Sequence, residues 1–361
     1  MSAKESATYD ALALFSGGLD SLLSIKMIQE QGLRVLGLHF ISPFFGNPHK
    51  TEHWEHAHGI ELLSWDVSQE FLDMLTRGPK HGLGKLLNPC VDCKIFMLTK
   101  AKSLMPEYGA KFIISGEVLG QRPMSQRKDT LYIIRRETGL QDELLRVLSA
   151  KHLPPTRPER EGLVDREKLG DLSGRSRKEQ LALARYYNIR EVPTPAGGCL
   201  LTQEESCKRY LPLLKNSSTP RAKDFHLANV GRQLWAEPVS GQPRRAWLVI
   251  GRHKQDNELI QDMAEPEDYL FKLKSHPGPT ALGRNLTGEP WPEEILHSAA
   301  SLVAYYSPKA RKSYREADVL LLHQGKSREL VVWPGSQEHI LGWEEPEWNQ
   351  DLAEELLETE A

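Results

Sequence analysis

The sequence of 361 residues has few cysteines, no long apolar run and no basic residue near its C-terminal end. Four cysteines are too few for a disulfide scaffold in a chain of this length, so we expect metal binding or redox chemistry from them. No apolar run reaches membrane-spanning length, and the first residues, MSAKESATYD, lack the pattern of a secretory signal. These absences predict a protein of soluble, globular composition that does not act at a membrane, and we expect it in the cytoplasm.

Charge is distributed unevenly along the chain. Residues 344–361 hold eight acidic residues and no Lys or Arg, although the formal net charge of the whole chain is only −3. Subtracting −8 from −3 leaves +5 on the rest. A mildly basic body can bind a polyanion, but so small an excess does not by itself indicate a nucleic acid. The acidic end, residues 343–361, is expected either to dock as an amphipathic helix or to form a disordered tail.

The most informative short stretch is SGGLDS at residues 16–21, which follows an apolar run and precedes an amphipathic stretch. This pattern predicts a strand, a tight glycine turn and a helix, which together point backbone N–H groups at an anion. Asp20 would repel a phosphate, so we expect it to hold Mg²⁺ beside one. The residues expected around the phosphates are Ser16, Gly17, Gly18 and Ser21.

Apolar and amphipathic stretches alternate through the first half of the chain. Strands are expected at residues 11–15, 33–40, 60–67 and 111–115, and helices at residues 49–58 and 69–76. Such alternation predicts an α/β fold with a parallel sheet and helices on both faces. Ligands in such folds bind at the carboxyl ends of strands. The glycine turn should therefore meet the segment after residue 115, where Gly116 allows a nucleotide to approach the backbone closely.

Three cysteines stand in patterns that suggest chemistry. Cys90 and Cys93 form a C-x-x-C pair in NPCVDCK, just before a helical stretch at residues 95–105. A helix N-terminus stabilises thiolates, and this spacing lets two sulfurs reach one metal or cluster. Cys199 follows two glycines in TPAGGCLLT, where it can occupy a crowded position. The fourth, Cys207, is expected to be structural.

These motifs resemble those of a known superfamily. SGGLDS resembles the SGGxDS PP-loop of ATP pyrophosphatases, whose fold is HUP-like and which activate a carbonyl oxygen by adenylation and release pyrophosphate. NPCxxC with a glycine-preceded cysteine about a hundred residues later resembles the tRNA 2-thiouridylases. GExLGQxxxSQ, which includes Gly116 and Gln121, resembles the 4-thiouridine synthetases, although their VASQ is RPMSQ here. The product, 2-thiouridine or 4-thiouridine, therefore stays open.

The resemblance implies an ATP- and Mg²⁺-dependent tRNA sulfurtransferase that adenylates a uridine carbonyl before sulfur displaces AMP. Its catalytic residues would be Asp20, Cys90 and Cys199. Two sulfur routes stay open: a 4Fe–4S cluster on Cys90, Cys93 and Cys199, or a persulfide resolved as a disulfide between Cys90 and Cys199. We expect the cluster, because three cysteines match its ligand count. Partners would be tRNA and a sulfur donor (a cysteine desulfurase, a carrier or sulfide), and a homodimer is left open.

The C-terminal third changes character and predicts a smaller α+β domain. Residues 245–325 resemble the RNA-binding domain of the fibronectin-binding-like proteins of ribosome quality control, through P-x-D-Y-L-F-K, HPGP and YYSPKAR. The resemblance implies RNA binding, with phosphate contacts at Arg252, Lys272, Lys274, Arg284, Lys309, Arg311 and Lys312. The expected division is therefore a PP-loop domain at residues 1–218, an RNA-binding domain at residues 221–342 and an acidic tail at residues 343–361.

Two other functions are compatible with parts of the sequence. A PP-loop amidotransferase or ligase acting on a small molecule would account for SGGLDS but would leave the three cysteines without a role. A non-catalytic RNA-binding factor that only senses ATP would account for the C-terminal third, and it predicts that Cys90→Ala and Asp20→Ala leave activity in cells intact.

Overall fold

The computed structural model describes residues 8–192, 198–236, 246–286, 289–335 and 342–357. The chain forms two compact units, one of residues 1–202 and one of residues 203–356. No helix in the described ranges is long and apolar enough to cross a membrane.

The first unit is built on a parallel sheet with strand order β3-β2-β1-β4-β5. The strands are β1 (Ala11–Leu14), β2 (Val35–Ile41), β3 (Glu61–Asp66), β4 (Phe112–Ser115) and β5 (Leu144–Arg146). The four predicted strands are confirmed, and the short β5 was not predicted. The chain leaves β1 toward β2 and later returns to β4 on the other side of β1. The order therefore reverses beside β1, which is where ligands bind in such sheets.

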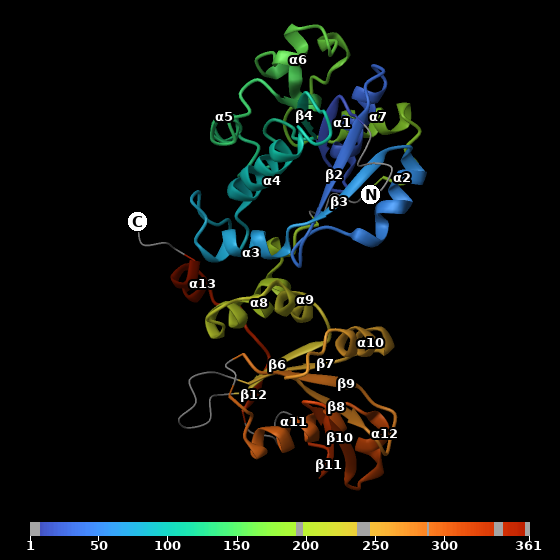
Figure 1. Ribbon diagram of the computed structural model, residues 1–361, viewed down its shortest axis with the longest axis vertical. Coiled ribbons are helices and arrows are strands. Elements are labelled where there is room, and N and C mark those ends of the chain that lie inside the picture. The colour runs from blue at the N-terminus through green and yellow to red at the C-terminus, as the bar shows by residue number, and fades with distance from the viewer. Residues whose placement is uncertain (1–7, 193–197, 237–245, 287–288, 336–341, 358–361) are drawn as a thin grey trace. The chain divides into compact units, whose positions relative to one another are not determined.

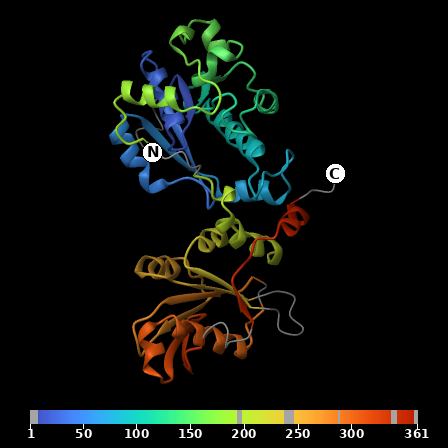
Figure 2. The ribbon, with the colours of Figure 1, turned by 180° about the vertical axis from the view of Figure 1, so that it is seen from behind.

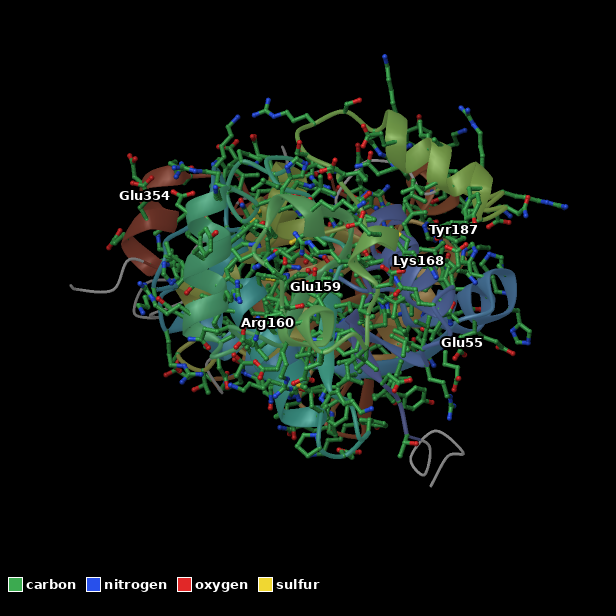
Figure 3. The ribbon with its side chains drawn as sticks, turned by 90° about the horizontal axis from the view of Figure 1, so that it is seen from above. Glu55, Glu159, Arg160, Lys168, Tyr187 and Glu354 are labelled. Atoms are coloured by element: carbon green, nitrogen blue, oxygen red, sulfur yellow. The ribbon has the colours of Figure 1, made fainter. Side chains whose placement is uncertain are left out.

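Helices cover both faces of this sheet, as predicted (Figure 1). They are α1 (Leu19–Gln29), α2 (Thr51–His58), α3 (Ser68–Thr76), α4 (Cys90–Leu104), α5 (Lys128–Glu137), α6 (Arg157–Arg160) and α7 (Lys178–Tyr186). Helix α1 is central to the core: Leu23, Ile25 and Ile28 are fully buried, because the sheet lies on one side of α1 and α7 on the other. Tyr187, which is labelled in Figure 3, follows α7. Its hydroxyl donates a 2.6 Å hydrogen bond to Glu30, the residue after α1.

The second unit is built on an antiparallel sheet, seen from behind in Figure 2. Its strand order is β11-β10-β8-β9-β7-β6-β12. Its strands are β6 (Arg232–Ala236), β7 (Ala246–Ile250), β8 (Tyr269–Leu273), β9 (Thr280–Arg284), β10 (Ala317–His323), β11 (Lys326–Val332) and β12 (Trp343–Glu344). Its helices are α8 (Glu204–Asn216), α9 (Ala222–Ala228), α10 (Lys254–Asp262), α11 (Glu293–Tyr305), α12 (Pro308–Ser313) and α13 (Gln350–Leu357). Helix α11 packs on the sheet and completes an apolar core with strands β8 and β10.

The units divide at different points from those expected. The first unit ends at residue 202 rather than 218, because α8 packs against α9. The Tyr210 ring lies 5.7 Å from that of Phe225, and the Tyr210 hydroxyl donates a 2.6 Å hydrogen bond to Asn229. The segment expected as an acidic tail also begins inside the second unit, because Trp343 pairs with β6 and is buried. Farther along it forms helix α13.

Candidate functional site

The turn after β1 has the geometry of an anion site. Gly17 has a φ of +76°, and a Cβ there would lie 2.6 Å from the ring of Trp54 on α2, so only glycine fits. The Ser21 hydroxyl donates a 2.8 Å hydrogen bond to the Gly18 carbonyl and closes the turn. Helix α1 then begins without a side-chain cap at Gly18. The N–H groups of its first turn are thus available to an anion such as a phosphate.

The end of β4 contacts the start of α1, as the neighbouring positions of β1 and β4 require. A Cβ on Gly116 would lie 2.5 Å from the backbone carbon and oxygen of Asp20. Any side chain at Gly116 would therefore displace the first turn of α1. The expected meeting of the glycine turn with the segment after residue 115 is borne out by this contact.

Asp20 carries a buried carboxylate oxygen that lacks a partner. Gln121 donates a 3.1 Å hydrogen bond to Oδ2 of Asp20. The buried Oδ1 has no hydrogen-bond partner in the described part of the chain. Burial raises the pKa of the Asp20 carboxyl, an effect that Gln121 and the nearby charges of Arg177 and Arg122 oppose. Because Mg²⁺ prefers oxygen ligands, this unpaired carboxylate oxygen fits such a cation, and Asp20 would hold it.

Cys90 begins α4 and is linked to the same loop as Asp20. The Asn88 amide donates to the Cys90 sulfur at 3.1 Å and contacts the Met124 sulfur at 3.5 Å. Met124 belongs to the loop at residues 116–126, which also carries Gln121. The loop at residues 116–126 therefore contacts Asp20 through Gln121. Through Met124 the same loop contacts the Asn88 amide, which donates to the Cys90 sulfur.

Cys199 is held near α4 by a chain of packed aromatic rings. The Leu200 N–H donates a 2.7 Å hydrogen bond to the carbonyl of Phe44 in the segment after β2. The ring of Phe44 lies 5.8 Å from that of Phe71 on α3, which lies 5.8 Å from Phe96 on α4. These contacts bring a cysteine distant in sequence close to the C-x-x-C pair.

The three predicted cysteines lie near one another, and burial disfavours the thiolate form of Cys93. Cys90, Cys93 and Cys199 are all half-buried. Burial raises the pKa of the Cys93 thiol well above its usual range, and the nearby Cys199 raises it further. Burial therefore opposes the stabilisation of a thiolate that we expect from the helix N-terminus at this residue. Cys207 is fully buried in the second unit, as expected of a structural cysteine.

The 4Fe–4S cluster expected on Cys90, Cys93 and Cys199 stays a prediction. No group of three or more His, Cys, Asp or Glu side chains in the described ranges is arranged to hold a metal ion. Residues 194–197 of the TPAGGCLLT motif lie outside the described residues. We therefore derive no step through a cluster.

A buried ion pair that the sequence did not predict anchors the loop after β4. Arg146 on β5 and Glu117 are 3% and 2% exposed, and their side chains lie 3.2 Å apart. Burial by itself would raise the pKa of Glu117. The positive charges of Arg146 and, to a smaller extent, Lys94 lower it overall. The Ser115 hydroxyl also donates a 2.8 Å hydrogen bond to Glu117. An arginine within the apolar run LLRVL is the signal that could have revealed this pair.

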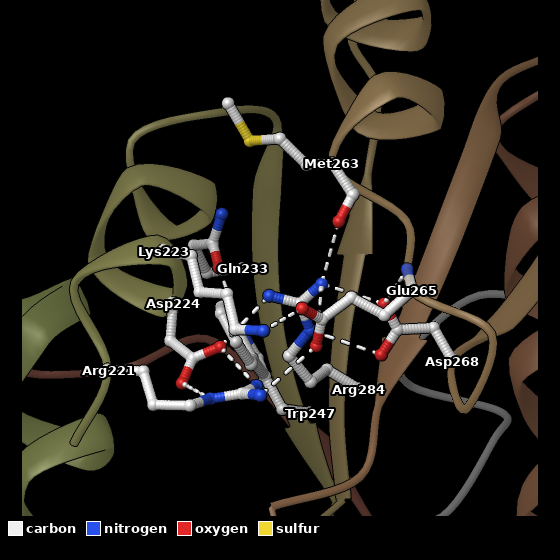
Figure 4. Close-up of polar contacts among 9 residues, drawn as sticks. All are labelled: Arg221, Lys223, Asp224, Gln233, Trp247, Met263, Glu265, Asp268 and Arg284. Atoms are coloured by element: carbon white, nitrogen blue, oxygen red, sulfur yellow. Dashed lines mark hydrogen bonds and ion pairs between the residues drawn. The ribbon is translucent and has the colours of Figure 1, made fainter.

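One of the expected phosphate contacts in the second unit is structural instead. Arg284 is 1% exposed and pairs with Asp224 at 2.9 Å and with Asp268 at 2.7 Å (Figure 4). It also donates a 2.8 Å hydrogen bond to the Met263 carbonyl. A phosphate cannot reach it, so that prediction is wrong. By contrast, Lys309, Arg311 and Lys312 on α12 are exposed.

Two family models match separate parts of this chain. Residues 6–148 match the family described as thiamine biosynthesis protein (ThiI), and residues 242–344 match the NFACT protein RNA binding domain. The chain contains a ThiI-family domain and an NFACT RNA-binding domain. The ThiI-family domain includes the glycine turn, Asp20, Gln121 and the C-x-x-C pair, whereas Cys199 lies beyond its match.

Two curated relatives are each similar to about a third of this chain. A probable tRNA sulfurtransferase of Thermococcus kodakarensis is 28% identical over 140 residues, which cover 36% of this chain and 34% of the relative. The tRNA-specific 2-thiouridylase MnmA of Petrotoga mobilis is 29% identical over 147 residues, which cover 35% of this chain and 39% of the relative. The chain thus spans between a third and two fifths of the length of these relatives.

Solved structures are more distant. The C-terminal part of the fibronectin/fibrinogen-binding protein from Streptococcus suis matches with a TM-score of 0.25 and 14% identity, covering 69% of this chain and 91% of that one. NMN synthetase from Francisella tularensis matches with a TM-score of 0.26 and 14% identity, covering 53% and 90%.

Proposed function

We propose that this protein thiolates a uridine of tRNA in an ATP-dependent reaction, with the ThiI-family domain as the catalytic part and the second unit as an RNA-binding part. The names of the two curated relatives and the NFACT match support tRNA as the substrate. The reaction would take place in the cytoplasm, where ATP and tRNA are available.

The observation that carries the proposal is the loop at residues 116–126. Through Gln121 it contacts Asp20 of the proposed nucleotide site, and through Met124 it contacts the amide that binds Cys90. An enzyme that activates a carbonyl with ATP and then delivers sulfur to it needs its phosphate site and its cysteines close together. A ligase acting on a small molecule would not need the cysteines there.

In the first step, the chain would bind and orient ATP. The glycine turn and the first turn of α1 would hold the phosphates, while Asp20 would position Mg²⁺, which neutralises charge on them. The uridine carbonyl oxygen would then attack the α-phosphorus, and pyrophosphate would leave. Arg122 and Arg177, whose charges act on Asp20, would add positive charge around the same phosphates.

In the second step, a cysteine would supply the sulfur. A persulfide on Cys199 would attack the activated carbon, and AMP would leave. The Cys90 thiolate would then attack the Cys199 sulfur, which breaks the S–S bond, releases the thiocarbonyl and forms a Cys90–Cys199 disulfide. An external dithiol would reduce that disulfide, and an external donor would reload the sulfur. Cys93, whose raised pKa keeps it as a thiol, would not be the attacking group.

Mass spectrometry of nucleosides from bulk tRNA tests this function. A deletion strain should lose one thionucleoside, and the intact gene should restore it. Genes carrying Asp20→Ala, Cys90→Ala or Cys199→Ala should not restore it. Cys207→Ala is the matched control, because it removes a cysteine that takes no part in the proposed chemistry, and it should restore the product.

The alternatives predict different results from the same strains. A strain that keeps every thionucleoside, with redundant enzymes also deleted, would contradict the proposal and favour a small-molecule ligase. Restoration by both Asp20→Ala and Cys90→Ala would instead favour a non-catalytic RNA-binding factor. The reappearing nucleoside would also show whether the product is 2-thiouridine or 4-thiouridine.

A further inference from the structure

The second unit contains a charged cleft that lies mostly outside its family match. The cleft has a volume of about 110 Å³ and is formed by α8, β6 and the segments after β7 and β12. Its charged lining residues are Glu205, Lys208, Arg209, Arg232, Arg252 and Glu345. Gly231 also lines the cleft. Its φ is +65°, and a Cβ there would lie 2.5 Å from the Ile250 carbonyl oxygen, so a residue with a side chain would not fit.

Two of the four cations in this cleft are neutralised by carboxylates. Lys208 lies 2.7 Å from Glu205, and Arg252 lies 2.7 Å from Asp256. The two other cations, Arg209 and Arg232, form no ion pair with a carboxylate of the described residues. The four lining cations, the two lining carboxylates and Asp256 beside Arg252 together leave a charge of +1.

The two unneutralised arginines are held by weak backbone contacts. Arg209 donates a 3.3 Å hydrogen bond to the Ala228 carbonyl, and Arg232 donates a 3.5 Å hydrogen bond to that of Gly251. The Arg232 guanidinium also lies over the Tyr306 ring, 4.7 Å from its centroid. Both residues are half-buried, so their charge is less screened by water than that of an exposed side chain.

Charges of both signs act on Arg209, and another cation is among them. Burial lowers the pKa of Arg209 and repulsion by the nearby Arg252 lowers it further, whereas the carboxylates of Glu205 and Glu345 raise it. An anion bound between the guanidinium groups would relieve this repulsion. Arginine suits such a ligand, because its planar fork of N–H donors matches a phosphate.

We propose that this cleft binds a phosphate of the RNA backbone. The inference rests on the proposed function, because it takes the RNA to be the tRNA substrate. The volume of about 110 Å³ suits a single phosphate group, since pockets for whole small molecules usually enclose roughly 300 Å³ or more. The NFACT match begins at residue 242, after Lys208, Arg209 and Arg232 in the chain. The proposed RNA-binding surface therefore extends beyond that match into α8 and β6.

Filter binding of the intact chain to unmodified tRNA, over a range of salt concentrations, tests this site. The double variant Arg209→Gln and Arg232→Gln should raise the Kd about tenfold and reduce the slope of log Kd against log salt by about 1. The matched control, Lys215→Gln with Lys326→Gln, removes the same charge from exposed positions of the second unit and should change the Kd less than threefold. Arg209→Gln alone retains the Arg232 stacking on Tyr306 and should show part of the loss.

Removing a negative charge from the cleft tests the same site in the opposite direction. Glu345→Gln removes a lining carboxylate, so it should tighten tRNA binding two- to threefold at low salt. Thermal unfolding of each variant would separate a lost contact from a lost fold.

Several outcomes would overturn the inference. One is an unchanged Kd and salt slope in the double variant. Another is a double variant that no longer binds inorganic phosphate but binds tRNA normally, which would make the cleft a small-anion site. An intact chain that binds no tRNA would also refute it, whereas nucleoside mass spectrometry would still judge the proposed function.

Discussion

Compared with the unmodified chain, the Asp20→Asn variant should have a higher free energy of unfolding without ATP and a lower one with Mg-ATP. In the unliganded chain, Oδ1 of Asp20 is buried without a partner, and burial raises the pKa of the carboxyl. The charge therefore opposes folding. Leaving a buried polar group unsatisfied costs about 1–3 kcal/mol, and a neutral amide lowers this penalty without removing it. We expect Asp20→Asn to raise the free energy of unfolding by about 1 kcal/mol.

The pH dependence of this stability change follows from the direction of the pKa shift of Asp20. Because the folded pKa is raised, the folded state holds its proton to a higher pH than the unfolded state does. The carboxyl therefore destabilises the fold increasingly as pH rises through the range between the two pKa values. The advantage of Asp20→Asn should be full above the raised pKa and should vanish below about pH 4, where both states are protonated.

Differential scanning calorimetry at neutral pH, with and without Mg-ATP, measures both effects. For a unit of roughly 200 residues, about 1 kcal/mol corresponds to a rise in Tm of about 2–4 °C. Mg-ATP at a hundredfold excess over its Kd should stabilise the unmodified chain by about 2.7 kcal/mol, and most of that gain should be absent in Asp20→Asn. The order of the two Tm values should thus reverse on adding Mg-ATP.

Asp129→Asn is the matched control for this experiment. Asp129 lies in the first turn of α5 and is exposed, and the Thr130 N–H and the Arg127 side chain lower its pKa. Its replacement should leave the Mg-ATP shift intact and should not raise the Tm. A fall in the Tm of unliganded Asp20→Asn would refute the claim that the buried charge opposes folding. A full Mg-ATP shift in that variant would refute the role of Asp20 in holding Mg²⁺.

Three further predictions follow from single contacts. Arg284→Ala leaves Asp224 and Asp268 buried without their partner, so urea unfolding should show a loss of about 3–5 kcal/mol from the second unit; a loss below 1 kcal/mol would contradict this. Gly116→Ala displaces the first turn of α1, so calorimetry should show a Mg-ATP shift reduced by at least half, and an unchanged shift would exclude the close contact. Cys93 should resist iodoacetamide at pH 8, and labelling followed by peptide mass spectrometry would detect rapid alkylation if its pKa is not raised.

The features that the sequence alone determined are local ones. The glycine turn, the strand before it and the helix after it are specified by adjacent residues, so SGGLDS predicted its own geometry. The same holds for Cys90 and Cys93 at the start of α4, because a C-x-x-C pair before an apolar helical stretch needs no distant partner. Alternating apolar stretches likewise predicted the parallel sheet and four of its strands.

Only the tertiary structure decided which distant residues meet. Gly116 touches Asp20 because β4 pairs with β1, and strand order is not written in the pattern of any one strand. Cys199 reaches α4 through three phenylalanine rings from different elements. Arg284 looks like any other surface cation in the sequence, yet two aspartates distant in the chain bury and neutralise it. Local propensity determines an element, whereas burial and pairing depend on contacts that form only when the whole unit folds.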